Sequence, residues 1–139
     1  MKHRLFFPLV VSAAILSGAV LLPKEASSLP PQDGPQQHRF RIAKLNNQWK
    51  VHDSKDSRTR VIRAKRGDVV YWTAAGSDLY FQFPDSTLFE SSEAAVADGK
   101  ELALTVSKNA APGRYTYSVF CMKERKFATG DSPPVIIIR

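Results

Sequence analysis

The sequence predicts an all-β domain of about eight strands, arranged as an antiparallel Greek-key β-sandwich or barrel, behind a hydrophobic N-terminal segment. From residue 38 onward, short runs alternate between polar and apolar residues, which is the period of two expected for strands with one buried face. Turn-forming residues separate these runs at short intervals, and no long segment has the spacing of an amphipathic helix. The pattern therefore favours a protein built from strands.

The first 26 residues are expected to form an export signal peptide or an N-terminal membrane anchor helix. Lys2 and Arg4 precede a stretch from residue 5 to 22 that has no charged side chain, as in a signal peptide. Small residues at 17 to 19 predict cleavage near Val20, whereas an apolar run of this length also suffices to span a bilayer uncleaved. Both alternatives place the rest of the chain outside the cytoplasm, in the periplasm or the extracellular space, because the positive charges come first.

Residues 27 to 37 are predicted to be a proline-rich linker, because Pro30, Pro31 and Pro35 stand there among small polar residues. The following residues, 38 to 139, are enough for one domain with a single core and no disulfides. After residue 26 the chain carries 17 basic and 12 acidic residues, a net charge of +5. Such a charge suits an anionic surface and also keeps a protein soluble.

Five strands are expected in the first half of the domain. In residues 39 to 45, Phe40 and Ile42 share one face of the strand. A turn at residues 46 and 47 then leads into a returning strand. The predicted strands of this half are residues 39 to 45, 49 to 52, 60 to 64, 69 to 73 and 79 to 83.

Three more strands are expected in the second half, at residues 101 to 106, 114 to 121 and 135 to 138. The last of these is continuously apolar, which predicts burial on both faces. Residues 85 to 99 are the least regular part of the chain, and a short helical turn is expected around residues 91 to 96.

Three segments in this order resemble the cupredoxins: RGDVVYW at 66 to 72, APGRYTY at 111 to 117, and Phe120-Cys121. In that family a Gly-Asp turn introduces a strand with a V-x-W or similar motif. A Pro-Gly turn then precedes a Y-x-Y strand that ends at a copper-ligating cysteine. The resemblance covers residues 38 to 139 and implies a cupredoxin-like domain of the plastocyanin or azurin type.

The copper ligands of that family are missing from the sequence. A type 1 site needs two imidazoles and a thiolate, usually with an axial thioether. Residues 74 to 83, where the family has its first histidine, contain none, and residues 123 to 139 contain neither histidine nor methionine. No cofactor is therefore expected. Cys121 and Met122 are the remaining metal candidates, and as neighbours on a strand they would point to opposite faces.

His38 and His52, the two histidines of the domain, are expected to be exposed strand residues near the end of the sandwich away from the family's metal position. Cys121 is the only cysteine, so no intramolecular disulfide forms and a buried thiol is expected. The alternative is a reactive thiol whose pKa is lowered by nearby cations such as Lys123.

Charged residues elsewhere do not indicate a site. The acidic residues of the irregular part are interpreted as solvated loop carboxylates: Asp78, Asp85, Glu90, Glu93 and Asp98. The tripeptide at 66 to 68 is interpreted as a turn. The basic residues at 58 to 66 do not share one strand face, and with those at 123 to 126 they are expected to form a diffuse positive rim without the aromatic residues of a nucleic-acid platform.

The sequence contains no nucleophile elbow, phosphate-binding glycine loop, zinc-ligand spacing or calcium loop, so neither an enzyme nor a catalytic residue is expected. It predicts an exported, non-enzymatic cupredoxin-like binding or accessory module without type 1 copper. Its expected partner is an envelope or extracellular protein or an anionic surface, not nucleic acid. The alternatives are a copper-binding or electron-transfer protein that uses Cys121 with a non-standard ligand set, and a subunit of an envelope complex.

Overall fold

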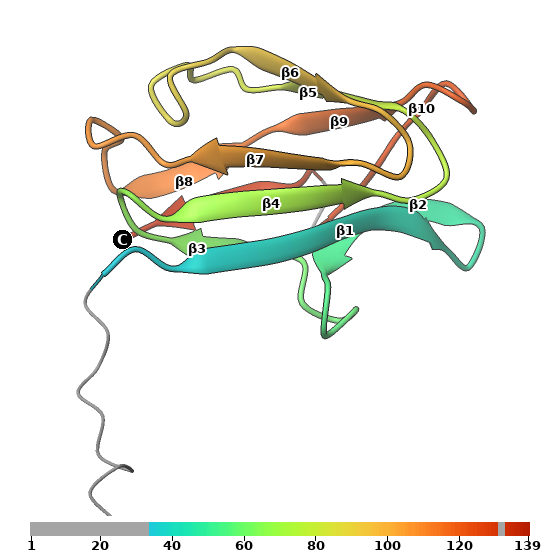
Figure 1. The fold of residues 1–139 in the computed structure, drawn as a ribbon, viewed down its shortest axis with the longest axis horizontal. Coiled ribbons are helices and arrows are strands. Elements are labelled where there is room, and N and C mark those ends of the chain that lie inside the picture. Colours follow the sequence, from blue (N-terminus) through green and yellow to red (C-terminus); the bar gives the residue numbers. More distant parts are fainter. Residues whose placement is uncertain (1–33, 131–132) are drawn as a thin grey trace, which may run out of the picture. The chain divides into compact units, whose positions relative to one another are not determined.

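Eleven strands form the secondary structure of the described chain (Figure 1). The computed structural model describes residues 34 to 130 and 133 to 139. The predictions on the signal or anchor and on most of the linker lie outside these residues. The strands are β1 (Gln37–Leu45), β2 (Gln48–Asp53), β3 (Ile62–Ala64), β4 (Val69–Ala74), β5 (Leu79–Gln82), β6 (Glu93–Val96), β7 (Glu101–Thr105), β8 (Gly113–Thr116), β9 (Ser118–Cys121), β10 (Lys126–Phe127) and β11 (Val135–Ile138).

The strands hydrogen-bond in three sheets, with the orders β2-β1-β4-β7, β10-β9-β5-β6 and β3-β11-β8. The all-β prediction is thus confirmed for the described residues. Among the described residues, six strand pairs are antiparallel, as expected, and two, β1 with β4 and β3 with β11, are parallel, which the antiparallel prediction did not include. Within the described part of the chain, no helix is long and apolar enough to cross a membrane.

The long strand predicted at residues 114 to 121 is divided at Tyr117. Before it, β8 pairs with β11, and after it, β9 pairs with β5, so the chain changes sheets at this residue. The Tyr117 N–H donates to the carbonyl of Pro134 instead of joining either ladder. The split, together with the short strands β6 and β10 that were not expected, raises the count from about eight strands to eleven.

The helical turn expected around residues 91 to 96 is a strand. Glu93–Val96 forms β6, which pairs antiparallel with β5 from Gln82 to Leu79. Without β6, one edge of β5 would be left without a partner. Satisfying these backbone groups outweighs the helix preference of the two alanines in this segment.

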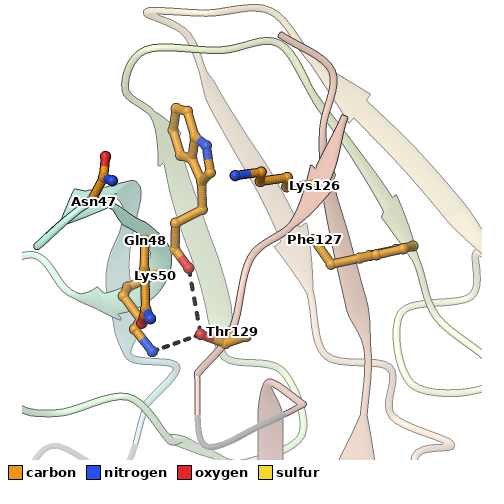
Figure 2. A pocket seen from close by; sticks show the side chains of 7 residues that line it. Asn47, Gln48, Lys50, Lys126, Phe127 and Thr129 are labelled. Atoms are coloured by element: carbon orange, nitrogen blue, oxygen red, sulfur yellow. Dashed lines mark hydrogen bonds between the residues drawn. The ribbon is translucent and has the colours of Figure 1, made fainter. Parts of the chain in front are cut away.

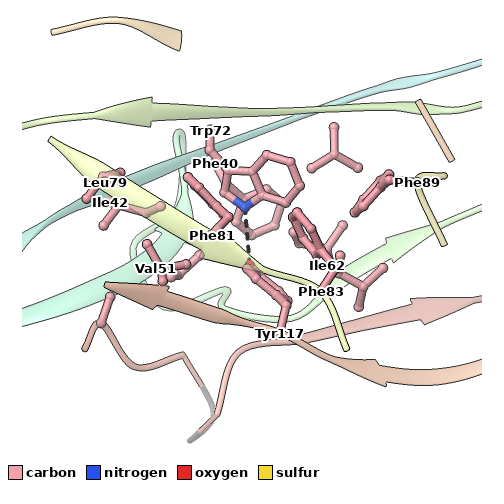
Figure 3. Close-up of a cluster of buried hydrophobic side chains, with 14 of the residues drawn as sticks. Phe40, Ile42, Val51, Ile62, Trp72, Leu79, Phe81, Phe83, Phe89 and Tyr117 are labelled. Carbon is pink, nitrogen blue, oxygen red and sulfur yellow. Dashed lines mark hydrogen bonds between the residues drawn. The ribbon is translucent and has the colours of Figure 1, made fainter. Parts of the chain in front are cut away.

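The core lies between the layers and is centred on the indole of Trp72, which comes from β4 (Figure 3). Its ring centroid lies 5.2 Å from that of Phe81 and 5.8 Å from that of Tyr117. The Trp72 Nε1 also donates to the Tyr117 hydroxyl at 3.2 Å. Phe40 and Ile42 are buried on one face of β1, as their alternation predicts.

The hairpin between β1 and β2 turns at Asn46 and Asn47, whose φ values of 52° and 65° are those of a two-residue hairpin with both central residues left-handed. The turn sets the register in which Ile42 faces Val51 and Lys44 faces Trp49. It thereby directs Trp49 toward the interior.

Residues 126 to 130, here called the crossing segment, connect two sheets. Phe127 pairs with Phe120 of β9, and the N–H of Ala128 donates to Val119. One residue later, Thr129 bonds with β2 instead: its N–H donates to the Trp49 carbonyl at 3.0 Å, and its carbonyl accepts from the Val51 N–H at 2.8 Å. The crossing segment thus occupies the outer edge of β2.

Candidate functional site around Cys121

Cys121 is the last residue of β9, and its side chain is fully buried. It pairs with Leu79 on one side and Lys126 on the other. Burial raises the pKa of its thiol to about 11, and the negative charge of Glu124 contributes in the same direction. The expectation of a buried thiol is confirmed, and nothing around Cys121 lowers its pKa as the reactive-thiol alternative requires.

Met122 follows on the opposite side of the chain and is 51% exposed. Its N–H donates to the carbonyl of Asp78, and the next N–H, that of Lys123, donates to the Ser77 hydroxyl at 2.9 Å. The Ser77 hydroxyl itself donates to the carbonyl of Asp78. Ser77 stands in the stretch where the resemblance would place a histidine. It is buried, and its hydroxyl links the loop before β5 to the turn after β9 by hydrogen bonds.

Trp49 covers the end of the domain near these loops. It is 5% exposed, and its Nε1 donates to Oε2 of Glu124 at 2.8 Å. Glu124 also accepts from Lys44, and hydrogen bonds from Lys44 and Trp49 lower the pKa of this carboxyl. Sequence reasoning did not single out Trp49 or Glu124, because the two are 75 residues apart and no local pattern joins them.

Gly76 makes the position of Trp49 possible. Its φ is +108°, and a Cβ at this position would lie 3.2 Å from Cη2 of the Trp49 ring. A glycine avoids both the strained conformation and the close contact. The segment between the predicted strands 69 to 73 and 79 to 83 thus also provides the surface on which the indole packs.

His38 and Cys121 lie near opposite ends of β4, although each belongs to another strand. The Nε2 of His38 hydrogen-bonds Oδ2 of Asp68 at 2.8 Å, just before the start of β4. Cys121 is paired with Leu79, which follows the other end of β4. Six residues of β4 span about 20 Å. His38 sits away from Cys121, as expected, but its side chain is only 19% exposed and is hydrogen-bonded to Asp68, so it is not the exposed strand residue that was predicted.

His52 is buried, at 6% exposure, so the prediction that it is an exposed strand residue was wrong. Its neighbour Val51 faces the core, and His52 therefore projects from the other face of the sheet. Its Nδ1 lies 2.9 Å from the carbonyl of Asp53, whereas its Nε2 has no hydrogen-bond partner among the residues that the structure describes. The sheet itself separates His52 from Cys121.

These positions do not fit a type 1 copper site. Neither described histidine approaches Cys121, and the thioether of Met122 projects from the opposite side of its strand. In residues 34 to 130 and 133 to 139, no group of three or more His, Cys, Asp or Glu side chains is placed to hold a metal ion.

The acidic residues of the irregular part hold that part together. Asp98 accepts from the N–H of Gly76 at 2.7 Å, and Asp78 accepts from the N–H of Asp98 at 2.8 Å. The side chains of Asp85, Glu90 and Glu93 likewise each accept a hydrogen bond, from Thr87, Ser107 and Tyr80 respectively. These carboxylates thus serve as hydrogen-bond acceptors for nearby groups of the protein.

Asp68, interpreted from sequence as a turn residue, is buried, and its carboxylate accepts several hydrogen bonds. Its N–H donates to Lys65, which closes the turn. Its carboxylate accepts from the N–H groups of Gln36 and Lys65 and from His38. Burial acts to raise the pKa of Asp68, but these hydrogen bonds outweigh it and the pKa is lowered. Because Gln36 is included and β1 begins at Gln37, these contacts reach into the last residues of the predicted linker.

Comparison with known proteins finds similarity only in structure: no protein-family model and no curated protein sequence matches the chain. A Cu(I) structure of an amicyanin variant has a TM-score of 0.44 and 16% identity over 74% of this chain and 82% of that chain. An oxidised amicyanin variant has the same TM-score and identity over 78% and 95%. A pseudoazurin from Sinorhizobium has a TM-score of 0.41 and 20% identity over 75% and 74%.

Amicyanin and pseudoazurin are cupredoxins, so the family that the sequence motifs resemble is also the family of these solved structures. At these TM-scores and identities, no ligand, residue role or partner of theirs is transferred to this chain.

Proposed function

We propose that this chain is an exported, non-enzymatic binding or accessory module with a cupredoxin-like Greek-key fold and without a type 1 copper site. The observation that carries the proposal is the closed end of the domain around Cys121. There a buried thiol with a raised pKa lies near loops tied by Ser77, and the indole of Trp49 packs against Gly76. This arrangement provides neither imidazole ligands nor an open position at the sulfur.

The chemistry of the described side chains supports a non-enzymatic role. Cys121, a strong nucleophile when ionised, is buried in its neutral form. The buried Tyr117 also has a raised pKa and donates no proton to solvent, because its hydroxyl meets only the core. Neither group is placed for acid, base or nucleophilic work on a substrate.

Export is part of the proposal because of the N-terminal sequence. The charged start, the apolar run and the small residues at 17 to 19 are the features of a secretory signal. The following proline-rich stretch suits a spacer between a membrane and the domain if the apolar segment stays attached. Fractionation of cells that express the chain tests this part, and a cytoplasmic location would contradict it.

The test of the copper-free module is a titration of the exported protein with cuprous and cupric ions, followed by visible absorption and native mass spectrometry. We expect no stoichiometric binding by the wild-type protein or by Cys121→Ser. Stoichiometric binding that is lost in Cys121→Ser would overturn the proposal and favour the alternative, a copper protein with a non-standard ligand set.

A further inference from the structure

Two adjoining grooves flank the side chains of Gln48 and Lys50 on β2. One lies beside the crossing segment, has a volume of about 280 Å³, and is also lined by Asn47, Lys126 and Thr129 (Figure 2). The other lies beside the loop before β3, has a volume of about 470 Å³, and is also lined by Asn46, Ser57, Arg58 and Arg60. Because Gln48 and Lys50 line both, the two grooves form one continuous surface, here called the β2 groove.

Positive charge exceeds negative charge on the β2 groove. Its lining contains the cations Lys50, Arg58, Arg60 and Lys126 and no carboxylate. Arg58 pairs with Asp56 nearby. Among the described residues, by contrast, no carboxylate forms a salt bridge with Lys50, Arg60 or Lys126. Lys50 instead donates a hydrogen bond to the neutral hydroxyl of Thr129, at 2.8 Å.

A buried donor adds a second, independent observation. The Nε of Arg60 is buried and has no hydrogen-bond partner among the described residues. A buried donor of this kind costs free energy unless an acceptor satisfies it. Because this atom is closed to solvent, an anion in the groove that Arg60 lines would satisfy it only after the Arg60 side chain shifts.

The neutral groups of the β2 groove indicate which class of ligand bears the anionic groups. Amides of Asn46, Asn47 and Gln48 and hydroxyls of Ser57 and Thr129 lie between the cations. Such groups bond the hydroxyls of a sugar as well as its acidic groups. Figure 2 shows Lys126 extending toward the hairpin side of the groove. Phe127 also lines this groove and is 60% exposed, so the groove offers a flat aromatic ring beside its polar groups.

From these observations we infer that the β2 groove binds an acidic carbohydrate chain, with carboxylate or sulfate groups at the cations and sugar hydroxyls at the amides. The inference rests on the proposed function as a binding module and names the class of ligand that the module takes.

Binding of defined polymers to the exported protein tests this inference. The probes are polygalacturonate and dextran sulfate, which carry carboxylates and sulfates on sugars, neutral dextran, and poly-L-glutamate, which carries carboxylates without sugars. We expect both acidic glycans to bind in a salt-dependent manner, more tightly than poly-L-glutamate, and dextran not to bind. A preference between the two acidic glycans distinguishes a carboxylated from a sulfated source.

Single-charge variants localise the effect. Lys50→Gln and Lys126→Gln should each weaken glycan binding by about twofold to fivefold, the size expected for one rim ion pair. Lys100→Gln removes one charge from an exposed residue between β6 and β7 and should change the affinity by less than about twofold. Unchanged urea unfolding would show that all three variants are folded.

Three results would overturn the inference: no binding of either acidic glycan at low salt, equal weakening by Lys100→Gln, or tighter binding of poly-L-glutamate, which would indicate an acidic protein segment as the partner. The proposed function is judged separately, because only copper binding that depends on Cys121 contradicts its copper-free site.

Discussion

The indole Nε1 of Trp49 donates a hydrogen bond to Oε2 of Glu124, 2.8 Å away, and so joins the β1–β2 hairpin to the turn that follows Cys121. Glu124 is held at the same time by Lys44 of the same hairpin. The closed end of the domain is therefore fixed by one carboxylate that receives two donors from β1 and β2.

Trp49→Phe should lower the free energy of unfolding by about 1 to 3 kcal/mol. The smaller ring neither reaches Glu124 nor fills the space against Gly76. Urea denaturation measures the change, and Phe127→Leu, at a side chain that is 60% exposed, serves as the control. A loss no larger than that of the control would show that Trp49 does not hold this end together.

Gly76→Ala should destabilise the domain more than Gly99→Ala. Both glycines have positive φ, +108° and +82°, so both substitutions strain the backbone. Only the new Cβ at residue 76 meets Trp49, whereas nothing lies within 4 Å of that at residue 99. We expect each substitution to cost about 1 to 2 kcal/mol in strain, with a further loss at Gly76 by thermal unfolding. Equal losses would argue against the contact with Trp49.

Cys121 should resist iodoacetamide in the native protein and react in urea. With a pKa of about 11, about one thiol in a thousand is ionised at pH 8, and the sulfur is buried as well. Mass spectrometry of the alkylated protein gives the modified fraction. Rapid modification without denaturant would mean that the loops around Cys121 open readily.

Asp68→Asn should reduce stability by about 1 to 3 kcal/mol near neutral pH, because the amide has one acceptor oxygen for three donors. The pKa of Asp68 is lowered in the folded protein. Its stabilising effect is therefore complete above the unfolded value of about 3.8 and is lost as the pH falls through the lower folded value. The difference between wild type and variant in urea unfolding should narrow over that acidic range. A difference that stays constant down to pH 2 would contradict this account.

Tyr117→Phe should cost about 1 to 3 kcal/mol, since the buried Trp72 N–H would lose its acceptor. Tyr115→Phe is the matched control, because the hydroxyl of Tyr115 bonds the carbonyl of Ala111 at the surface. Guanidinium unfolding of both variants makes the comparison. A larger loss at Tyr115 would show that the core bond is not the stronger contribution.

The sequence was informative where local pattern and tertiary structure agree. The alternation around Phe40 and Ile42 predicts the face of β1 that is buried, and the asparagine pair predicts the hairpin turn. The continuous alternation through Tyr117 hid the change of sheets, because a strand can leave one ladder for another without altering its period. Likewise, Glu93–Val96 has no strand-forming composition of its own and becomes a strand by pairing with β5.

The candidate site could be predicted only in part. The missing histidines could be counted in the sequence, and the burial of Cys121 was expected because an unpaired cysteine is usually a buried one. The hydrogen bond between Trp49 and Glu124, which covers this end of the domain, could not be foreseen, because the two residues are 75 positions apart in the sequence. His52 was misjudged because strand parity places it on the outer face and does not reveal that neighbouring segments bury it.

The crossing segment has a consequence for association between copies of the chain. An edge strand with free N–H and C=O groups is a template on which another chain can add a strand and begin to aggregate. β2 is an edge strand of its sheet, yet Thr129 of the same chain already occupies the backbone groups of Trp49 and Val51. The domain thus blocks this part of its own edge against intermolecular β-pairing, while the side chains of the β2 groove stay open to solvent.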